Sequence, residues 1–339
     1  MQDHTQVTSP KLPGSHGVWI PPLANELIVG EIKSHADALG VSSLQIPGYW
    51  IHKDRDLEVG EPPSPGEKIV YYAHGGAYVV HTAHPDGRMA IIPKGFLEHC
   101  PTITRTFAVE YRLLRLSAKP VHPFPTAFID TLAGYTYLVG LGFKEENIVL
   151  CGDSAGGNLA LALTRYLIDN RDTVPSLPRA PGALVLISPW ADVSESLEVA
   201  APQSATELPV HDWMLRMDSE EMGRIVKAFL GYRPDEIENA ERHVYSAPAS
   251  PYLLGLTSDS TTRKVWFKDF PPTWIDFGGS EVLRDQIRRL GMAMEEDLGK
   301  GKFVMNECPG GVHDYVMFDW YEPERSESMR KIAAWLEDV

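Results

Sequence analysis

Cysteine and long apolar runs are scarce in this chain of 339 residues. Cys100, Cys151 and Cys308 are odd in number and widely spaced, which argues against a disulfide framework and predicts reduced thiols in an intracellular protein. No apolar run reaches the ~18 residues that a membrane-spanning helix needs, and residues 1–12 lack the apolar core of a signal peptide. We therefore expect a cytoplasmic protein without a membrane span.

Basic residues are also in the minority, with 31 Lys and Arg against 46 Asp and Glu and a formal net charge of −15. This charge argues against nucleic acid or an anionic membrane surface as a partner. The hydrophobic fraction of 43% and the charged fraction of 23% are typical of a globular protein. The sequence leaves the oligomeric state open, with a homodimer as one option.

Short apolar segments alternate with helical patterns along most of the chain. Strands are predicted at residues 44–52, 68–73, 102–109, 148–151, 183–188, 273–277 and 303–306. Helices are predicted at 22–39, 126–141, 282–298 and 324–336, with another directly after Ser154. Residues 183–187 are continuously apolar, as expected for a strand buried on both faces of a parallel sheet. The alternation predicts an α/β fold in which a mostly parallel, doubly wound sheet has helices on both faces.

The centre of the chain carries a Gly-x-Ser-x-Gly sequence, Gly152 to Gly156, between an apolar strand and a run rich in Ala and Leu. This is the pattern of a nucleophile elbow, in which the glycines two before and two after the serine leave room for a tight turn. The turn lifts the Ser154 hydroxyl above the sheet edge, and the following helix directs its first N–H groups at whatever the serine attacks. A glycine-rich loop without chemistry is the alternative interpretation of the pattern alone.

Four loops follow predicted strands and carry glycine or polar residues suited to catalysis, at residues 74–77, 152–157, 278–283 and 309–314. In a doubly wound sheet, such loops lie beyond the carboxyl ends of the strands, where ligands bind. A nucleophile, an acid and a histidine in this chain order are typical of the α/β-hydrolase fold.

These loops resemble those of the hormone-sensitive-lipase-like branch of α/β-hydrolases, the family IV esterases, and the resemblance spans residues 70–336. The matching motifs are His74–Ala77, Tyr111–Leu113 followed by His122–Pro125, Gly152–Gly157, Gly278–Asp285 and Gly310–His313. Two features depart from the family pattern: residues 114–119 lengthen the Tyr-Arg-Leu loop, and Glu281 stands where the family usually has aspartate. The resemblance implies an esterase without a cofactor that prefers short to medium acyl chains.

The chemistry gives three residues catalytic roles. The hydroxyl of Ser154 is a weak nucleophile at neutral pH and needs a base, for which His313 is the candidate. His313 in turn needs a carboxylate to fix its tautomer and stabilise the imidazolium, and Glu281 matches the family position. Asp285 or Asp314 is the alternative acid, in which case Glu281 would be a helix N-terminal charge.

The negative oxygen of a tetrahedral intermediate needs N–H donors. Backbone N–H groups of Gly76, Ala77 and Ala155 are the expected oxyanion hole, and Gly75 and Gly76 allow the backbone to approach closely. His74 is expected to brace this loop, as the equivalent histidine does in the family.

The substrate pocket is expected to include Tyr78, His81, Trp213 and Met217. His81, His84 and Asp86 have the side-chain types of a metal site, but no confident third ligand follows from their spacing, so we predict no metal. Cys151 is expected to be a small buried residue of the strand before the elbow.

Two segments are expected to shape the pocket from outside the sheet. Residues 1–17 predict a loose tail, and the helix at 22–39 predicts a cover over the active site. Residues 192–262 are acidic, with a helical patch at 218–229, and predict an insertion that forms lid and pocket wall. We thus divide the chain into a tail and lid helix, 1–45, and a catalytic domain, 46–339, that carries the insertion.

The leading hypothesis is a serine carboxylesterase that cleaves a short-to-medium acyl ester, acetyl included, of a small apolar molecule through an acyl-Ser154 intermediate. A lyase, a cyclase or an amide hydrolase acting on a natural product would use the same scaffold, since fold does not fix function. A ligand-binding receptor without catalysis is the third hypothesis, and the presence of Ser154, Glu281 and His313 argues against it.

Overall fold

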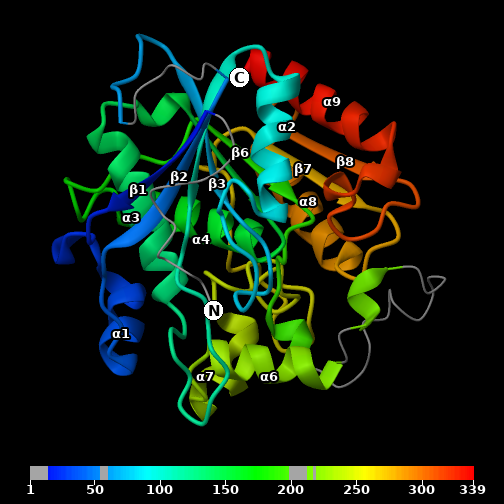
Figure 1. Ribbon diagram of the computed structural model, residues 1–339. Helices are drawn as coiled ribbons and strands as arrows, with labels where there is room; N and C mark the ends of the chain where they lie inside the picture. The colour runs from blue at the N-terminus through cyan, green and yellow to red at the C-terminus, as the bar shows by residue number, and fades with distance from the viewer. Residues whose placement is uncertain (1–13, 54–59, 198–211, 217–218) are drawn as a thin grey trace.

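A single sheet organises the protein in a computed structural model that describes residues 14–53, 60–197, 212–216 and 219–339 (Figure 1). Within these residues the sheet has eight strands in the order β1-β2-β4-β3-β5-β6-β7-β8. The strands are β1 Ser15–Ile20, β2 Ile46–His52, β3 Lys68–Ala73, β4 Ile103–Val109, β5 Ile148–Asp153, β6 Ala183–Ile187, β7 Thr273–Gly278 and β8 Phe303–Cys308. β2 is antiparallel to both β1 and β4. The six strands β3 to β8 run parallel to one another. The predicted α/β fold with a mostly parallel sheet is confirmed.

Helices cover both faces of the sheet (Figure 1). The described helices are α1 Gly30–Leu39, α2 Ile91–His99, α3 Thr126–Gly140, α4 Ala155–Asn170, α6 Ser219–Phe229, α7 Pro234–Glu238, α8 Arg284–Leu298 and α9 Glu324–Asp338. Buried side chains of α3, α4 and α8 belong to one core, and those of α2 and α9 belong to a second core. Each core lies between the sheet and its own layer of helices.

Strand β3 shows how its sequence builds both cores at once. Ile69, Tyr71 and Ala73 belong to the core beneath α3 and α4, while Val70 and Tyr72 belong to the core beneath α2 and α9. Because side chains alternate between the two faces of a strand, a strand covered on both faces must be apolar at every position. This is why the uninterrupted apolar runs in the sequence predict the central strands well.

The N-terminal region differs from its prediction in two places. Residues 15–17, predicted as loose tail, belong to β1, which pairs antiparallel with β2 and extends the sheet by one edge strand. The helix predicted at 22–39 begins only at Gly30, which has a φ of 59°, after a short 3-10 turn at Asn25–Leu27. The left-handed backbone at Gly30 breaks the predicted helix.

Helices α1, α6 and α7 gather at one end of the molecule (Figure 1). Phe229, at the end of α6, packs against Tyr78 with ring centroids 4.7 Å apart and against Phe124 at 5.3 Å. His35 of α1 also packs against Phe124, at 5.4 Å. Part of the 192–262 segment therefore contacts Tyr78 directly, whereas the N-terminal helix contacts Phe124.

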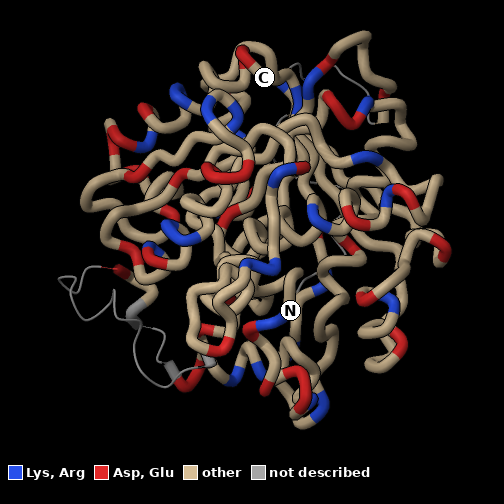
Figure 2. The backbone as a smooth tube through the Cα atoms, turned by 180° about the vertical axis from the view of Figure 1, so that it is seen from behind, with Lys and Arg blue, Asp and Glu red and all other residues tan. Residues whose placement is uncertain are grey.

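Charged and apolar residues are distributed in the ordinary way for a globular fold. On the face seen in Figure 2, acidic and basic residues are interspersed and do not form a basic stripe. No helix among the described residues combines the length and the apolar character needed to cross a bilayer. Cys100, Cys151 and Cys308 are free thiols, and all of them are buried.

Candidate active site

Ser154 lies at a sharp turn between β5 and α4. Its φ of 50° and ψ of −116° are a strained conformation for a residue with a side chain, and the surrounding backbone holds it in place. The Ser154 N–H donates to Ile187 O at 2.9 Å, and Ser154 O accepts from Trp190 N at 2.9 Å. The serine is thus fixed at the carboxyl edge of the sheet, directly before the N-terminus of α4.

The glycines around Ser154 are required by close backbone contacts. A Cβ on Gly152 would lie 2.2 Å from Gly156 O, and a Cβ on Gly156 would lie 2.0 Å from Ala73 O. Both distances are far below van der Waals contact, and both involve backbone atoms that cannot move independently. The Gly-x-Ser-x-Gly spacing therefore follows from the way the turn packs against itself and against the end of β3 (Lys68–Ala73).

The glycine-rich loop after β3 lies against the elbow. A Cβ on Gly75 would lie 2.2 Å from Asp153 Oδ2, and Gly76 has a φ of 116°. Within the described residues, the N–H groups of Gly76, Ala77 and Ala155 donate to no protein acceptor. These are the three N–H groups predicted for the oxyanion hole, and each can still donate a hydrogen bond to a ligand.

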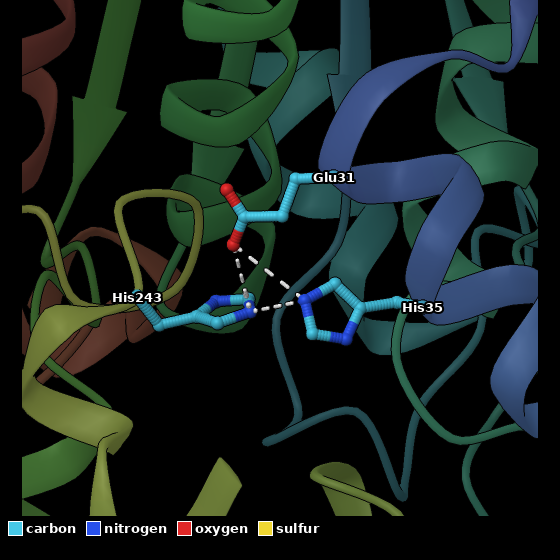
Figure 3. Close-up of side chains that lie close together, drawn as sticks. All are labelled: Glu31, His35 and His243. Carbon is cyan, nitrogen blue, oxygen red and sulfur yellow. Dashed lines mark hydrogen bonds and ion pairs between the residues drawn. The ribbon is translucent and has the colours of Figure 1, made fainter.

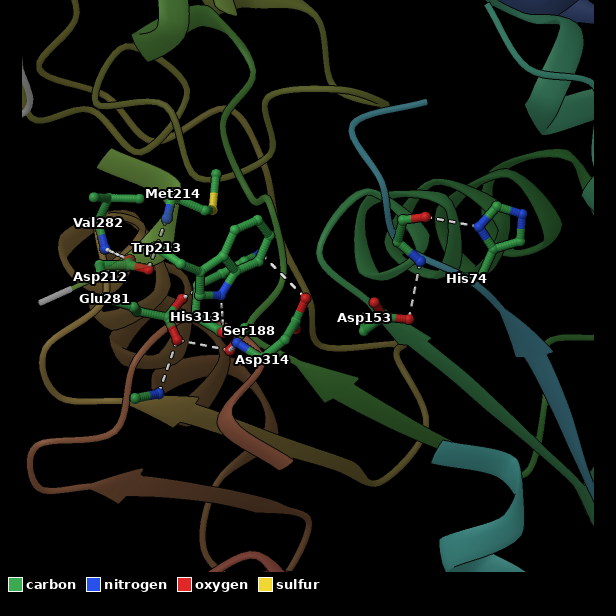
Figure 4. Close-up of polar contacts among 12 residues, drawn as sticks. His74, Asp153, Ser188, Asp212, Trp213, Met214, Glu281, Val282, His313 and Asp314 are labelled. Atoms are coloured by element: carbon green, nitrogen blue, oxygen red, sulfur yellow. Dashed lines mark hydrogen bonds and ion pairs between the residues drawn. The ribbon is translucent and has the colours of Figure 1, made fainter. Parts of the chain in front are cut away.

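Asp153 ties this loop to the elbow. Its Oδ1 accepts a hydrogen bond from Gly75 N at 3.0 Å (Figure 4). The same oxygen accepts from the Tyr72 hydroxyl. Burial raises the pKa of Asp153 to about 6, while the hydrogen bonds from Tyr72 and Gly75 oppose that increase. A buried carboxylate with two donors is well suited to hold the loop at a fixed distance from Ser154.

His74 braces the same loop from the other side. Its Nδ1 lies 2.7 Å from Gly75 O (Figure 4). Its ring stacks on Tyr111 with centroids 4.3 Å apart. The Tyr111 hydroxyl also donates to His74 O at 2.6 Å. Burial lowers the pKa of His74 to about 3, so the ring is neutral at physiological pH. The contacts of His74 are those of a structural brace.

Glu281 and His313 lie together at the ends of β7 and β8, where their loops meet (Figure 4). His313 Nδ1 is 3.3 Å from Glu281 Oε1, and both side chains are buried. The other carboxylate oxygen, Oε2, accepts from Ser188 Oγ at 2.6 Å and from Gly278 N at 2.8 Å. Three hydrogen bonds therefore fix the Glu281 carboxylate in place, and it orients the imidazole through Nδ1.

The longer side chain of Glu281 fits because its own backbone turns back toward the strand. Gly278 is the last residue of β7, and its N–H donates to the carboxylate of Glu281, three residues later. The alternative acid, Asp285, forms an ion pair with Arg284 at 3.0 Å and is substantially exposed. Of the acids proposed from the sequence, Glu281 is the one placed on Nδ1.

The second nitrogen of His313 contacts a carboxylate instead of the serine. His313 Nε2 lies 3.2 Å from Asp314 Oδ2, and in the described part of the chain the Ser154 hydroxyl has no hydrogen-bond partner. Burial opposes a charged imidazolium, but the carboxylates of Asp314 and Glu281 raise the pKa of His313. Burial also raises the pKa of Asp314. His313 and Asp314 consequently share a proton as a coupled pair.

The predicted pocket residues have different surroundings. Trp213 donates from Nε1 to His313 O at 2.9 Å, with its ring 5.7 Å from the imidazole. His81 lies against the backbone at Gly76, where an added Cβ would come within 2.9 Å of His81 Cδ2. Tyr78 is buried and donates to Asn158 Oδ1 at 2.6 Å. Met217 lies outside the described residues.

Two further residues belong to this arrangement, and the sequence analysis did not single them out. Ser188 links Glu281 to the backbone next to His313, because its hydroxyl donates to Glu281 and accepts from Asp314 N at 3.0 Å. Asp212 accepts from Met214 N at 3.1 Å and from Val282 N at 2.8 Å, which connects Trp213 to the Glu281 loop. A serine directly after a buried strand, and an Asp directly before Trp-Met-Leu, were the available signals.

The residues considered for a metal at the loop after the glycine turn make local contacts. Asp86 N donates to His84 Nδ1 at 3.2 Å, and the His84 ring packs on Tyr49. Among the described residues, His81, His84 and Asp86 do not bring three ligand atoms together; another cluster, discussed below, does so.

Comparison with known proteins agrees with this geometry. A family model described as alpha/beta hydrolase fold matches residues 70–317. The chain is 29% identical over 283 residues to the esterase LipU of Mycobacterium tuberculosis, covering 83% of this chain and 81% of LipU. It is 28% identical over 267 residues to an acetyl-hydrolase of Streptomyces hygroscopicus, covering 78% of this chain and 73% of that protein.

A solved structure described as a hormone-sensitive lipase from a metagenome library has the same fold. Its TM-score is 0.62 at 19% identity, covering 87% of this chain and 83% of that chain. The chain belongs to the α/β-hydrolase fold family. Its motifs resemble those of the hormone-sensitive-lipase-like, family IV esterases, and relatives that it matches in sequence are named esterases.

Proposed function

We propose that this carboxylic ester hydrolase cleaves short-to-medium acyl esters, acetyl esters included, of a small apolar molecule through an acyl-Ser154 intermediate. The observation that supports this most directly is the elbow. A strained serine lies directly before the N-terminus of α4, beside a loop whose glycines pack against that elbow. The strained conformation of this serine lowers the stability of the folded protein, and a turn with only a structural role would not require it.

The first half of the proposed reaction forms the acyl-enzyme. His313 Nε2 takes the Ser154 proton while Oγ attacks the ester carbonyl, and the developing oxyanion accepts from the N–H groups of Gly76, Ala77 and Ala155. Each such donor contributes ~3 kcal/mol to lowering the barrier. His313 then gives its proton to the leaving alcohol, and Glu281 stabilises the imidazolium throughout.

The second half of the reaction uses the same groups on water. His313 removes a proton from a water molecule that attacks the acyl carbonyl, and the collapse of the second oxyanion releases the carboxylic acid and returns the proton to Ser154. In both halves His313 Nε2 must exchange its contact with Asp314 for a contact with a hydroxyl or with water. Catalytic hydrogen bonds often tighten in this way only when substrate is bound.

Apolar and aromatic side chains near the site support an apolar ester. Trp213 contacts His313. Tyr78, on the loop that carries the proposed oxyanion donors, forms a contiguous aromatic group with Phe229 and Phe124. A small cavity lies among Tyr78, Phe124 and Phe229. Aromatic walls with a few convergent polar groups are typical of small-molecule sites.

The test is hydrolysis of p-nitrophenyl acetate and butyrate by the purified chain. We expect turnover of both esters, labelling by a fluorophosphonate probe, and a loss of ~10³-fold or more in kcat for Ser154→Ala. A matched control is Ser176→Ala, because Ser176 lies in the loop after α4, away from the elbow. Equal activity in Ser154→Ala and wild type would contradict the nucleophile, and no turnover together with no labelling would contradict the proposed function.

A further inference from the structure

A second cluster of titratable side chains lies between α1 and the segment after α7. Glu31 and His35 are one helical turn apart on α1, and His243 comes from the chain 208 residues further on (Figure 3). The two Nε2 atoms are 3.0 Å apart, and each lies 3.5 Å from Glu31 Oε1. Three atoms with lone pairs therefore converge on one point (Figure 3).

The spacing of these atoms matches three ligands of a tetrahedral zinc ion. With Zn–N and Zn–O bonds of about 2.0–2.1 Å, neighbouring ligand atoms of a tetrahedron are about 3.3–3.4 Å apart. The three measured separations, 3.0, 3.5 and 3.5 Å, lie on either side of this value. Two imidazoles and one carboxylate are a ligand set that proteins use for Zn²⁺, with the fourth position left to water.

Each imidazole also has a partner on its outer nitrogen. His35 Nδ1 lies 3.5 Å from Glu236 Oε1, and because a carboxylate only accepts, it favours a proton on Nδ1 and a lone pair on Nε2. His243 Nδ1 lies 2.9 Å from the Ser246 hydroxyl, which can accept as well as donate. Both rings can therefore direct lone pairs inward, since the outer nitrogen of His243 has a hydrogen-bond partner and that of His35 faces a carboxylate, an arrangement similar to that of metal-ligating histidines.

The three side chains differ in burial. His35 and His243 are buried, whereas Glu31 lies at the outer side of the cluster. The Glu31 side chain is 45% exposed, which gives an ion a route from solvent.

We propose that Glu31, His35 and His243 form a zinc site that joins the N-terminal helix to the pocket insertion. The site is separate from the hydrolytic chemistry, and its existence does not depend on the esterase proposal. Its position gives it a structural role. His35 and His243 both pack on Phe124, at 5.4 and 5.0 Å, and Phe124 packs on Phe229, which touches Tyr78. An ion at this position would connect α1 to the segment around His243, next to the aromatic side chains of Phe124, Phe229 and Tyr78.

The test is calorimetric titration of the tag-free full chain with Zn²⁺ after treatment with EDTA. We expect one ion per chain, with a dissociation constant of about 1 µM or lower. Zinc at a hundredfold excess over that constant should raise the melting temperature by about 4 °C. Co²⁺ in place of Zn²⁺ should give the visible absorption of a tetrahedral centre, which reports the ligand geometry without any activity assay.

Variants identify the ligands. Glu31→Gln should weaken zinc binding by about 10-fold and His243→Gln by about 100-fold or more, whereas His99→Gln, on the distant helix α2, should bind as wild type does. If His243→Gln does not fold, the partly exposed Glu31 still provides a readable variant. Glu236→Gln tests the outer partner of His35 and should weaken binding by about 10-fold.

Two results would overturn the zinc site. One is the absence of stoichiometric binding to the wild-type chain, which would mean that the three side chains share a proton and nothing more. The other is binding of equal strength in Glu31→Gln, His243→Gln and wild type, which would place the ion elsewhere on the surface.

Discussion

At the scale of single residues, the acid of the proposed triad is the unusual feature. Glu281 carries one more methylene than the aspartate usual in this family, yet it reaches His313 Nδ1 and accepts from Ser188 and Gly278. Asp285, four residues later, is paired with Arg284. The contacts therefore distinguish Glu281 from Asp285, which the sequence presents as alternative acids.

The first prediction concerns this choice. Glu281→Gln should lower kcat by about 10³–10⁴-fold, because a neutral amide cannot stabilise the imidazolium and favours the wrong tautomer. Asp285→Asn should leave kcat within about threefold of wild type. Steady-state kinetics on p-nitrophenyl butyrate measure both. A collapse in Asp285→Asn with an active Glu281→Gln would reverse the assignment.

The second prediction concerns Asp314. Its carboxylate raises the pKa of His313, and hydrolysis requires the neutral imidazole, so wild-type activity should appear only above that raised pKa. Asp314→Asn removes the charge and lowers the pKa of His313, which should shift the acidic limb of the kcat/KM profile to lower pH by about one unit or more. The pH–rate profiles of the two proteins measure this, with Asp285→Asn as the control. An acidic limb that stays in place or moves upward would contradict the coupling.

At the scale of elements, the elbow tolerates no additional atom. Gly156→Ala would place a Cβ 2.0 Å from Ala73 O, and because both are parts of the backbone, the loop after β3 would have to move. We expect a loss of about 3 kcal/mol or more in the free energy of unfolding, together with loss of activity.

Gly140→Ala is the matched control for this third prediction. Gly140 ends α3, and a Cβ built there meets no atom within 4 Å. We expect a gain of about 0.5–1 kcal/mol with unchanged activity. Urea unfolding followed by circular dichroism measures both variants, and a Gly156→Ala protein as stable as wild type would show that the elbow can relax.

Helices and strands could be predicted best where their own residues determine them, and less well where they depend on residues far away in the sequence. The strands β3, β5 and β6 appear as apolar runs because both faces are buried, and the predicted limits of β3 are the observed ones. By contrast, β1 is an edge strand with a partly exposed face, and its pairing with β2 depends on residues 26 to 36 positions away. The helix predicted at 22–39 had a consistent apolar face, and Leu23, Leu27 and Ile32 are indeed buried, but Gly30 interrupts it.

At the scale of the whole molecule, buried carboxylates link stability to pH. Asp192 is fully buried, and burial raises its pKa to about 7, with Glu195 adding to that effect. Because the folded state holds this proton more tightly than the unfolded state, the free energy of unfolding falls as pH rises from 5 toward 8.

The fourth prediction follows from that sign. Between pH 5 and pH 8, Asp192 alone should lower the free energy of unfolding by roughly 2–3 kcal/mol. Asp192→Asn cannot lose a proton, so its unfolding free energy should change less over the same interval. Denaturant unfolding at each pH measures the difference in slope. Parallel pH dependences in the two proteins would remove Asp192 from the explanation.

The part of the candidate site that depends on fold topology could be predicted from the sequence. A parallel sheet brings the loops after its strands to one edge, so the topology alone predicts that the loops of Ser154, Glu281 and His313 lie at that edge. The contact of Asp314 with Nε2, the link through Ser188 and the meeting of His35 with His243 depend on side-chain geometry between distant segments. No local pattern in the sequence encodes these contacts.

The three buried thiols have a practical consequence. Burial raises the pKa of Cys100 to about 12, and it also raises the pKa values of Cys151 and Cys308, so the native protein presents almost no thiolate to a reagent. Cys100 lies at the end of α2, Cys151 in the central strand β5 and Cys308 at the end of β8. Alkylation rates followed cysteine by cysteine would thus show in which order the layers of this protein open, without any change to its sequence.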